Sequence, residues 1–216
     1  MQNIPCPQPQ IQTPGFLAQR DQLFAIVRST PWLMACLREA RRLGLADWFI
    51  AAGAIRSTVW DYLHGRECRA TPSDIDLVYF APATPHAEDA CLETRLAAIE
   101  VSGVGRLEWD VTNQAQVHTW YGRGQADVPP LAPLQSTQHG LSTWPETATT
   151  IGVRLEADDS LTLAAPLGLE DLFALRLRWN PRLASREIFL QRVREKRLLE
   201  RWPRLTLVDG GDTAGA

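Results

Sequence analysis

Apolar residues in the first half of the chain alternate between helical and strand-like spacing. Leu23, Ile26 and Val27 recur at the spacing of one helix face, and Pro31 then breaks that helix and starts another. Short apolar runs bounded by Gly, Pro or Asp indicate strands. The predicted elements of this half are two helices within 19–42, a strand at 48–52, a helix at 55–64, a strand at 74–80, a helix at 86–102, a strand at 106–111 and a short helix or turn at 113–120.

The second half has fewer alternating runs. Residues 125–145 are rich in Pro, Gln, Ser and Thr, which predicts a connection dominated by loops. Asp158-Asp159 between two apolar runs indicates a β-hairpin, and two helices are predicted at 167–177 and 185–201. The chain is therefore expected to adopt an α/β or α+β fold. A mixed sheet would be flanked by helices and followed by a C-terminal hairpin and helices.

The two ends of the chain differ in composition from the rest. The polar, proline-rich segment 1–15 is expected to be a flexible arm, and the Gly/Ala/Asp tail at 209–216 is expected to be disordered. One domain is expected over 16–208. Its core would lie at about 45–125 and its hairpin and helical part at about 145–208.

Composition narrows the class of protein. Hydrophobic residues make up 45% and charged residues 22% of the chain, as in ordinary globular domains, and the net charge of −3 does not indicate a nucleic-acid binder. None of the 4 cysteines are at C-x-x-C spacing, so neither a zinc site nor a redox pair is predicted. The sequence has no secretory signal and no apolar run long enough to span a membrane, so a cytoplasmic protein is expected.

Two carboxylates open the predicted strand at 74–80. Side chains alternate between the faces of a strand, so Asp74 and Asp76 point the same way and Ile75 points the opposite way. Like charges side by side repel, and a bound cation would relieve that repulsion. An isolated Asp-x-Asp pair is more often a turn, a cap or a solvated edge, but this pair begins an apolar strand.

A third carboxylate, Asp110, lies in the next predicted strand. If the two strands pair, Asp110 joins the face of Asp74 and Asp76, while Trp109 and Val111 face the core. Three carboxylates on neighbouring strands make an oxygen-rich site suited to Mg²⁺. Two such ions clamp the attacking and leaving oxygens of a phosphoryl displacement.

A candidate phosphate cradle lies at the junction between the first strand and its helix. Gly53 and Ala54 carry no large side chain, so phosphates could approach the backbone closely, and the helix that follows offers unpaired N–H groups. Arg56 and Ser57 would add hydrogen-bond donors. A plain tight turn explains the same residues, and for this piece alone it is the commoner case.

The combination of these motifs resembles the polymerase-beta-type nucleotidyltransferase superfamily, and within it a bacterial branch of nucleotidyltransferase family proteins. The resemblance extends over about 32–205 and is carried by Gly53-Ala54-Ile55-Arg56, Val59-Trp60-Asp61, Asp74-Ile75-Asp76, Trp109-Asp110-Val111, Asn113-Gln114-Ala115, His118, Trp144 to Thr149, Ala165 to Phe173 and Asn180-Pro181. It implies Mg²⁺-dependent transfer of a nucleotidyl group from an NTP, such as ATP, to a hydroxyl. Asp74, Asp76 and Asp110 would be the catalytic, metal-binding residues, and Gly53 would approach the phosphates.

The chain departs from the superfamily pattern at three places. Ala54 stands where a Gly or Ser is usual, and nineteen residues separate it from Asp74, a longer gap that predicts an extra loop near the site. The branch is also expected to carry basic residues beside the Asn-Gln motif, where this chain has Thr112 and Gln116. These departures leave a non-catalytic nucleotide-binding or interaction module as one alternative. A toxin-type transferase acting on tRNA or protein is another.

The acceptor and the oligomeric state are not determined by the sequence. A basic stretch in the last third of the chain could attract RNA or the phosphates of a nucleotide. A solvated helix with ion pairs explains it nearly as well. RNA, a protein side chain and a small hydroxylated molecule therefore all stay open as acceptors. The basic residues of this stretch are Arg176, Arg178, Arg182, Arg186, Arg192, Arg194, Lys196, Arg197, Arg201 and Arg204.

Overall fold

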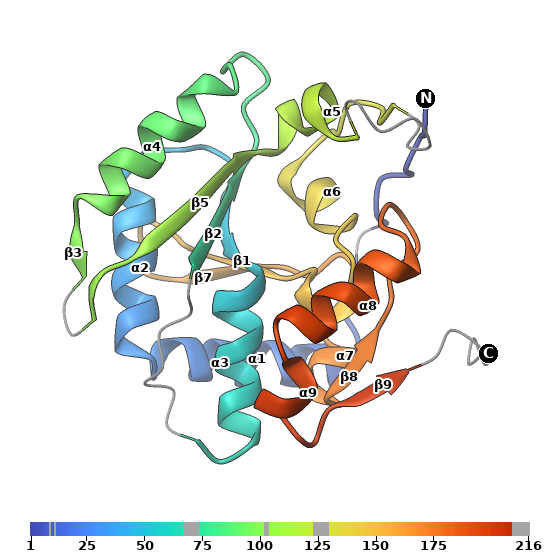
Figure 1. Ribbon diagram of the computed structural model, residues 1–216. Coiled ribbons are helices and arrows are strands. Elements are labelled where there is room, and N and C mark those ends of the chain that lie inside the picture. Colours follow the sequence, from blue (N-terminus) through green and yellow to red (C-terminus); the bar gives the residue numbers. More distant parts are fainter. Residues whose placement is uncertain (9, 11, 67–73, 102–103, 123–129, 209–216) are drawn as a thin grey trace.

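The computed structural model describes residues 1–8, 10, 12–66, 74–101, 104–122 and 130–208 (Figure 1). The helices are α1 (Pro14–Arg28), α2 (Pro31–Arg42), α3 (Ala52–Leu63), α4 (Ala87–Ala97), α5 (Val117–Trp120), α6 (Thr137–Leu141), α7 (Glu170–Phe173), α8 (Arg186–Glu195) and α9 (Leu198–Arg201), with 3₁₀ turns η1 (Gln114–Gln116) and η2 (Thr147–Thr149). The strands are β1 (Trp48–Ala51), β2 (Asp74–Tyr79), β3 (Glu100–Val101), β4 (Gly105–Arg106), β5 (Glu108–Asn113), β6 (Gly152–Leu155), β7 (Leu161–Ala164), β8 (Arg176–Arg178) and β9 (Thr206–Val208).

A mixed five-stranded sheet of order β5-β2-β1-β6-β7 forms the centre of the molecule. The β2–β5 pair is parallel, and the other three pairs are antiparallel. The predicted hairpin is the β6–β7 pair, and its turn residue Asp159 has a positive φ of 63°. The predicted fold class, a mixed sheet flanked by helices, is confirmed.

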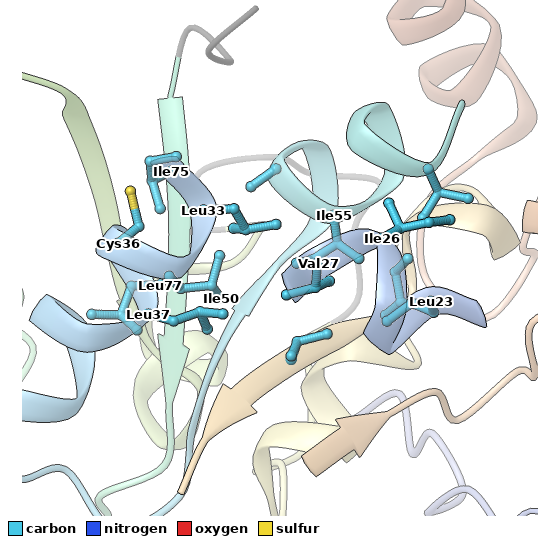
Figure 2. Close-up of a cluster of buried hydrophobic side chains, with 14 of the residues drawn as sticks. Leu23, Ile26, Val27, Leu33, Cys36, Leu37, Ile50, Ile55, Ile75 and Leu77 are labelled. Atoms are coloured by element: carbon cyan, nitrogen blue, oxygen red, sulfur yellow. The ribbon is translucent and has the colours of Figure 1, made fainter. Parts of the chain in front are cut away.

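One face of this sheet packs against helices and forms the main core. Figure 2 shows Leu23 from α1 and Leu33 from α2 directed toward the same interior as Ile50, Ile75 and Leu77 from β1 and β2. All five are fully buried, at 0% exposure. Burial of each such side chain contributes on the order of 1.5–3 kcal/mol, so this face supplies much of the fold's stability.

The opposite face of the sheet carries a smaller apolar cluster. Phe49, Ala51 and Val78 pack there against Leu141 of α6 and Ala164 of β7. The alternation of side chains along β2 therefore places Ile75 and Leu77 in the main core and Val78 with its neighbouring carboxylates on the second face. This second face is the one on which the predicted acidic residues lie.

The outer strand β5 is covered by α4, whose acidic side chains accept backbone hydrogen bonds. Glu93 Oε1 accepts from the Val111 N–H at 3.1 Å, and Asp89 Oδ2 accepts from the Asn113 N–H at 3.2 Å. Tyr79 of β2 donates its hydroxyl to Asp89 Oδ1 at 2.6 Å. These contacts satisfy amides that an edge strand leaves unpaired, and they fix β5 beside β2.

Several predicted elements differ from the structure. The helix predicted at 167–177 is only the single turn α7, because Leu175 adopts a positive φ of 55° and the chain continues as β8. The helix predicted at 185–201 divides into α8 and α9 at Arg197, whose φ is 50°. The helix predicted at 86–102 ends at Ala97 and is followed by β3. No Gly or Pro stands at any of these three breaks, so the sequence lacked the usual signals for them.

The segment before α1, predicted as a flexible arm, makes contacts along the domain. Ile4 is buried, and its carbonyl lies 2.9 Å from His139 Nε2. Gln10 donates its side-chain amide to the Pro166 carbonyl at 2.8 Å. The predicted tail at 209–216 lies outside the described residues, as does most of the predicted extra loop. Within the described part of the chain, no helix combines the length and the apolar character needed to cross a bilayer.

Candidate active site

The parallel pairing of β2 with β5 brings the predicted carboxylates to one face. Asp76 and Asp110 are partners across the two strands, and Asp74, two residues earlier in β2, shares their face. Ile75, Trp109 and Val111 are buried in the main core on the opposite face, as the alternation predicted.

The pKa of Asp76 reflects its burial and the charged groups around it. Burial, the largest cause, and repulsion from Asp74 and Asp110 together raise the pKa of the Asp76 carboxyl from 3.8 to about 6. The positive charges of Lys196 and Arg56 act in the opposite direction. Two acidic groups and two cations from distant parts of the sequence therefore lie close enough to act on Asp76.

A cavity of about 400 Å³ lies over this acidic face. Its sheet side is polar and includes Asp76 and Asp110. Its opposite side comes from the C-terminal half of the chain and includes two well-exposed apolar residues, Trp120 at 41% and Ile188 at 43% exposure. The lining residues are Ala52, Asp76, Val78, Asp110, Thr112, Gln114, Val117, Trp120, Tyr121, Thr143, Trp144, Pro145, Thr149, Leu183, Ala184, Ile188 and Arg192.

The carboxylates do not form a ready-made metal site. Among the described residues, no group of three His, Cys, Asp or Glu side chains converges closely enough to hold an ion. Repulsion between like charges favours separation of such oxygens, and after burial this repulsion is the next cause of the raised pKa of Asp76. Carboxylate oxygens are nevertheless the donors that Mg²⁺ prefers, so the donor set fits that ion in its chemistry.

Helix α3 starts directly after β1, beside the carboxylates. Ala51, the last residue of β1, pairs with Asp76, and Ala52 has a positive φ of 48°. The Ala52 N–H donates to the Ile151 carbonyl at 3.2 Å. A non-glycine residue in this left-handed conformation stores strain of order 1 kcal/mol, and here it turns the chain sharply from sheet to helix.

Gly53 occupies the open side of this turn. Its φ is not positive, and a Cβ added there would meet no protein atom within 4 Å. Neither backbone conformation nor packing within the described structure therefore requires glycine at this position. Gly53 and Ser57 are partly exposed, whereas Ala54 is fully buried.

Arg56, predicted as a phosphate ligand, is buried in an ion pair. Its guanidinium Nη1 donates to Glu146 Oε1, both side chains are 3% exposed, and the guanidinium carbon lies 5.0 Å from the ring centroid of Trp60. The Nε atom of Arg56 is buried without a hydrogen-bond partner among the described residues. The pair joins α3 to the segment that precedes η2.

Asn113 has a structural role. Its Oδ1 accepts from the N–H groups of Ala81 and Ala115, and its Nδ2 donates to the carbonyls of Ala81 and Thr84. This agrees with the helix-capping interpretation. Gln114, the next residue, lines the cavity.

Arg192 and Lys196 belong to the basic stretch of the sequence, but neither was predicted as a site residue. Arg192 lines the cavity, and Lys196 follows one helical turn later. Their i, i+4 spacing, which puts both on one side of α8, was the available signal.

Comparison with known proteins identifies the family. A family described as nucleotidyltransferase matches residues 38–207. A structure determined by NMR and described as a CCA-adding enzyme head domain superposes with a TM-score of 0.70 at 28% identity, covering 88% of this chain and 95% of that one. A tRNA-processing enzyme and a tRNA nucleotidyltransferase complexed with a primer tRNA and an incoming ATP analogue, each 19% identical, give TM-scores of 0.47 and 0.43.

The last two matches include 79% and 80% of the present chain. They include only 42% and 46% of the two longer enzyme chains. A search of curated protein sequences found no match. The family match extends over most of the chain, including β2, β5 and α8. The chain belongs to this family of nucleotidyltransferases.

Proposed function

We propose that the protein transfers a nucleotidyl group from an NTP to a hydroxyl acceptor in a Mg²⁺-dependent reaction, with Asp74, Asp76 and Asp110 as the metal-binding residues. The observation that carries this proposal is the pairing of Asp76 with Asp110 across β2 and β5, with Asp74 on the same face. The family membership supports nucleotidyl transfer in general. The assignment of residues rests on the geometry of this face.

The three carboxylates are suited to hold a divalent cation. The Asp76 carboxyl ionises less readily than a free aspartate, since burial and both neighbouring carboxylates raise its pKa to about 6. A cation at this position would favour the ionised form of all three groups. Two bound Mg²⁺ ions would neutralise charge on the transferring phosphate and acidify the acceptor hydroxyl.

The chain's own residues divide the remaining tasks. Gly53 leaves space for phosphate oxygens beside the N–H groups at the start of α3. Asp110 is more exposed than Asp76, so it is the better placed to take up the proton of an incoming hydroxyl. The acceptor oxygen bonds to the α-phosphorus, the bond from that phosphorus to the β-phosphate oxygen breaks, and pyrophosphate leaves.

The buried Arg56–Glu146 pair supports this arrangement indirectly. The positive charge of Arg56 favours the ionised form of Asp76, and Glu146 holds the guanidinium in place. We therefore assign Arg56 to positioning and to electrostatic support, and Gly53 and Ser57 to nucleotide contact. Ala54, which is fully buried, would contribute to the fit of the turn.

The test is transfer of label from each of the four α-³²P-labelled NTPs, with Mg²⁺, to total RNA, to protein or to a panel of small alcohols. Labelling should appear with the wild type and fall by at least about 100-fold in Asp76→Asn and Asp110→Asn. Asp21→Asn, on an exposed part of α1, is the matched control and should retain activity. Undiminished labelling by both site variants would exclude the proposed mechanism. Metal-dependent NTP binding without transfer to any acceptor would support a non-catalytic module.

A further inference from the structure

Two cations of α8 face the acidic side of the sheet. Arg192 lines the same cavity as Asp76 and Asp110. Lys196, the C-cap residue of α8, follows one helical turn later. Residues at i and i+4 lie on one side of a helix, so Lys196 shares the side of α8 from which Arg192 lines the cavity.

These two side chains differ from three other basic residues near the end of the described chain, which pair with acids. Arg176 and Arg178 pair with Asp171, and Arg197 pairs with Glu200. Arg192 and Lys196 are partly buried, and neither side chain makes a hydrogen bond or ion pair within the described part of the chain. Partly desolvated cations without an acidic partner are suited to bind an anionic ligand.

The lining of the cavity is acidic and holds little positive charge. Its sheet side offers carboxylates and neutral polar groups, and among the described lining residues Arg192 is the one cation. Arg56 is committed to Glu146. An NTP brings about four negative charges to this acidic surface, so additional cations would be required beside any bound metal.

We propose that Arg192 and Lys196 bind the terminal phosphates of the NTP and stabilise the pyrophosphate that leaves. This inference rests on the proposed function, because it takes the cavity to be the nucleotide site. The start of α3, with Ala52 in the lining, and the basic side of α8 border the same cavity. The terminal phosphates would lie between the N–H groups beside Gly53 and these two side chains, while the nucleoside extends toward the apolar lining near Trp120.

Phosphate groups of a nucleic-acid acceptor share the chemistry of a triphosphate. The test must therefore separate the two sources. A ligand that lacks the terminal phosphates but keeps the nucleoside and the first phosphate provides the contrast, and an RNA oligonucleotide provides the competing source.

The experiment is calorimetric titration of the full chain with α,β-methylene-ATP, with AMP and with an RNA oligonucleotide, all in the presence of Mg²⁺. Arg192→Gln and Lys196→Gln should each weaken binding of α,β-methylene-ATP about tenfold, since each removes a charge-assisted hydrogen bond, and leave AMP binding within about twofold. Arg194→Gln, an exposed neighbour on α8, is the matched control and should bind like the wild type. Thermal unfolding of each variant checks that the fold is retained.

Three results would overturn the inference alone. One is unchanged affinity of the Arg192→Gln/Lys196→Gln double variant for α,β-methylene-ATP, which would leave the proposed function standing. A second is an equal loss in Arg194→Gln, which would indicate a general effect of charge. The third is a loss confined to RNA binding, which would assign the cations to the acceptor. Absence of any binding of α,β-methylene-ATP to the wild type would refute the inference and the proposed function together.

Discussion

The guanidinium of Arg56 donates to the carboxylate of Glu146 and lies over the ring of Trp60. The two charged residues are ninety positions apart, and both side chains are 3% exposed. Glu146 follows Trp144 and Pro145, which line the cavity, and Arg56 lies in the first turns of α3. The ion pair thus joins the start of α3 to the C-terminal half of the chain at the level of the site.

Removal of one member of this pair should destabilise the protein strongly. Glu146→Leu leaves the Arg56 charge buried without its partner, which is expected to cost about 3–5 kcal/mol of unfolding free energy. Arg56→Met combined with Glu146→Leu should recover most of that loss, because no unpaired charge remains. Urea denaturation of the wild type, both single variants and the double variant measures the coupling. Additive losses would mean that the pair does not act as a unit.

Substitution at Gly53 should separate stability from binding. Gly53→Ala adds a Cβ that meets no protein atom within 4 Å and improves helix propensity, so unfolding free energy should stay constant or rise by up to about 1 kcal/mol. Binding of a Mg²⁺–NTP complex should weaken about tenfold or more, because the methyl group occupies the space assigned to phosphate. Thermal unfolding and calorimetric titration measure the two effects. Wild-type affinity in this variant would contradict the assignment of Gly53.

Substitution of Gly152, unlike that of Gly53, should lower the unfolding free energy. A Cβ at this position would lie 2.7 Å from the Cβ of Phe49 on the neighbouring strand β1. Gly152→Ala should therefore destabilise the fold by about 1–3 kcal/mol through overpacking. Denaturant unfolding of Gly152→Ala beside Gly53→Ala, whose added Cβ meets no protein atom within 4 Å, tests the cause. A loss confined to Gly152→Ala is expected, and an equal loss in both variants would indicate an origin other than overpacking.

The stability of the metal-free protein should depend on pH through Asp76. Its pKa is about 6 in the folded chain and near 3.8 in the unfolded chain, chiefly because burial disfavours the ionised form and Asp74 and Asp110 add repulsion. The folded state therefore binds the Asp76 proton more tightly than the unfolded state does. The stabilisation from this proton is complete below pH 4 and is lost as the pH rises through 6. The loss is about 3 kcal/mol at most, at 1.36 kcal/mol per pKa unit.

The comparison of wild type with Asp76→Asn isolates this effect. In EDTA, the variant should gain stability relative to the wild type as pH rises from about 4 to about 7.5, and the difference should level off above about pH 7. Addition of Mg²⁺ should stabilise the wild type more than the variant at about pH 7.5. Chemical denaturation across this pH range provides the measurement. A difference that does not change with pH would exclude Asp76 as the titrating group.

The acidic face was predictable because its determinants are local. Alternation along one strand is enough to place Asp74 and Asp76 on one side, and the parallel register of β2 with β5 adds Asp110, as expected if the two strands pair. The Arg56–Glu146 pair was not predictable, because it depends on how distant segments pack and Arg56 alone has the appearance of a phosphate ligand. The division of the last predicted helix at Arg197 was not predictable either, because Arg197 adopts the left-handed conformation without a Gly at that position.

Neighbouring positions of β2 belong to different environments, and this has a consequence for folding. A slip of one residue in the pairing of β2 would exchange the two faces, so that Asp74 and Asp76 would enter the apolar core and Ile75 would face the cavity. Desolvation of two carboxylates opposes such a slip in addition to the lost burial of Ile75 and Leu77. The same acidic residues that are assigned to chemistry therefore also act against misregistered strands, and a variant with Asn at both positions would lose part of that protection.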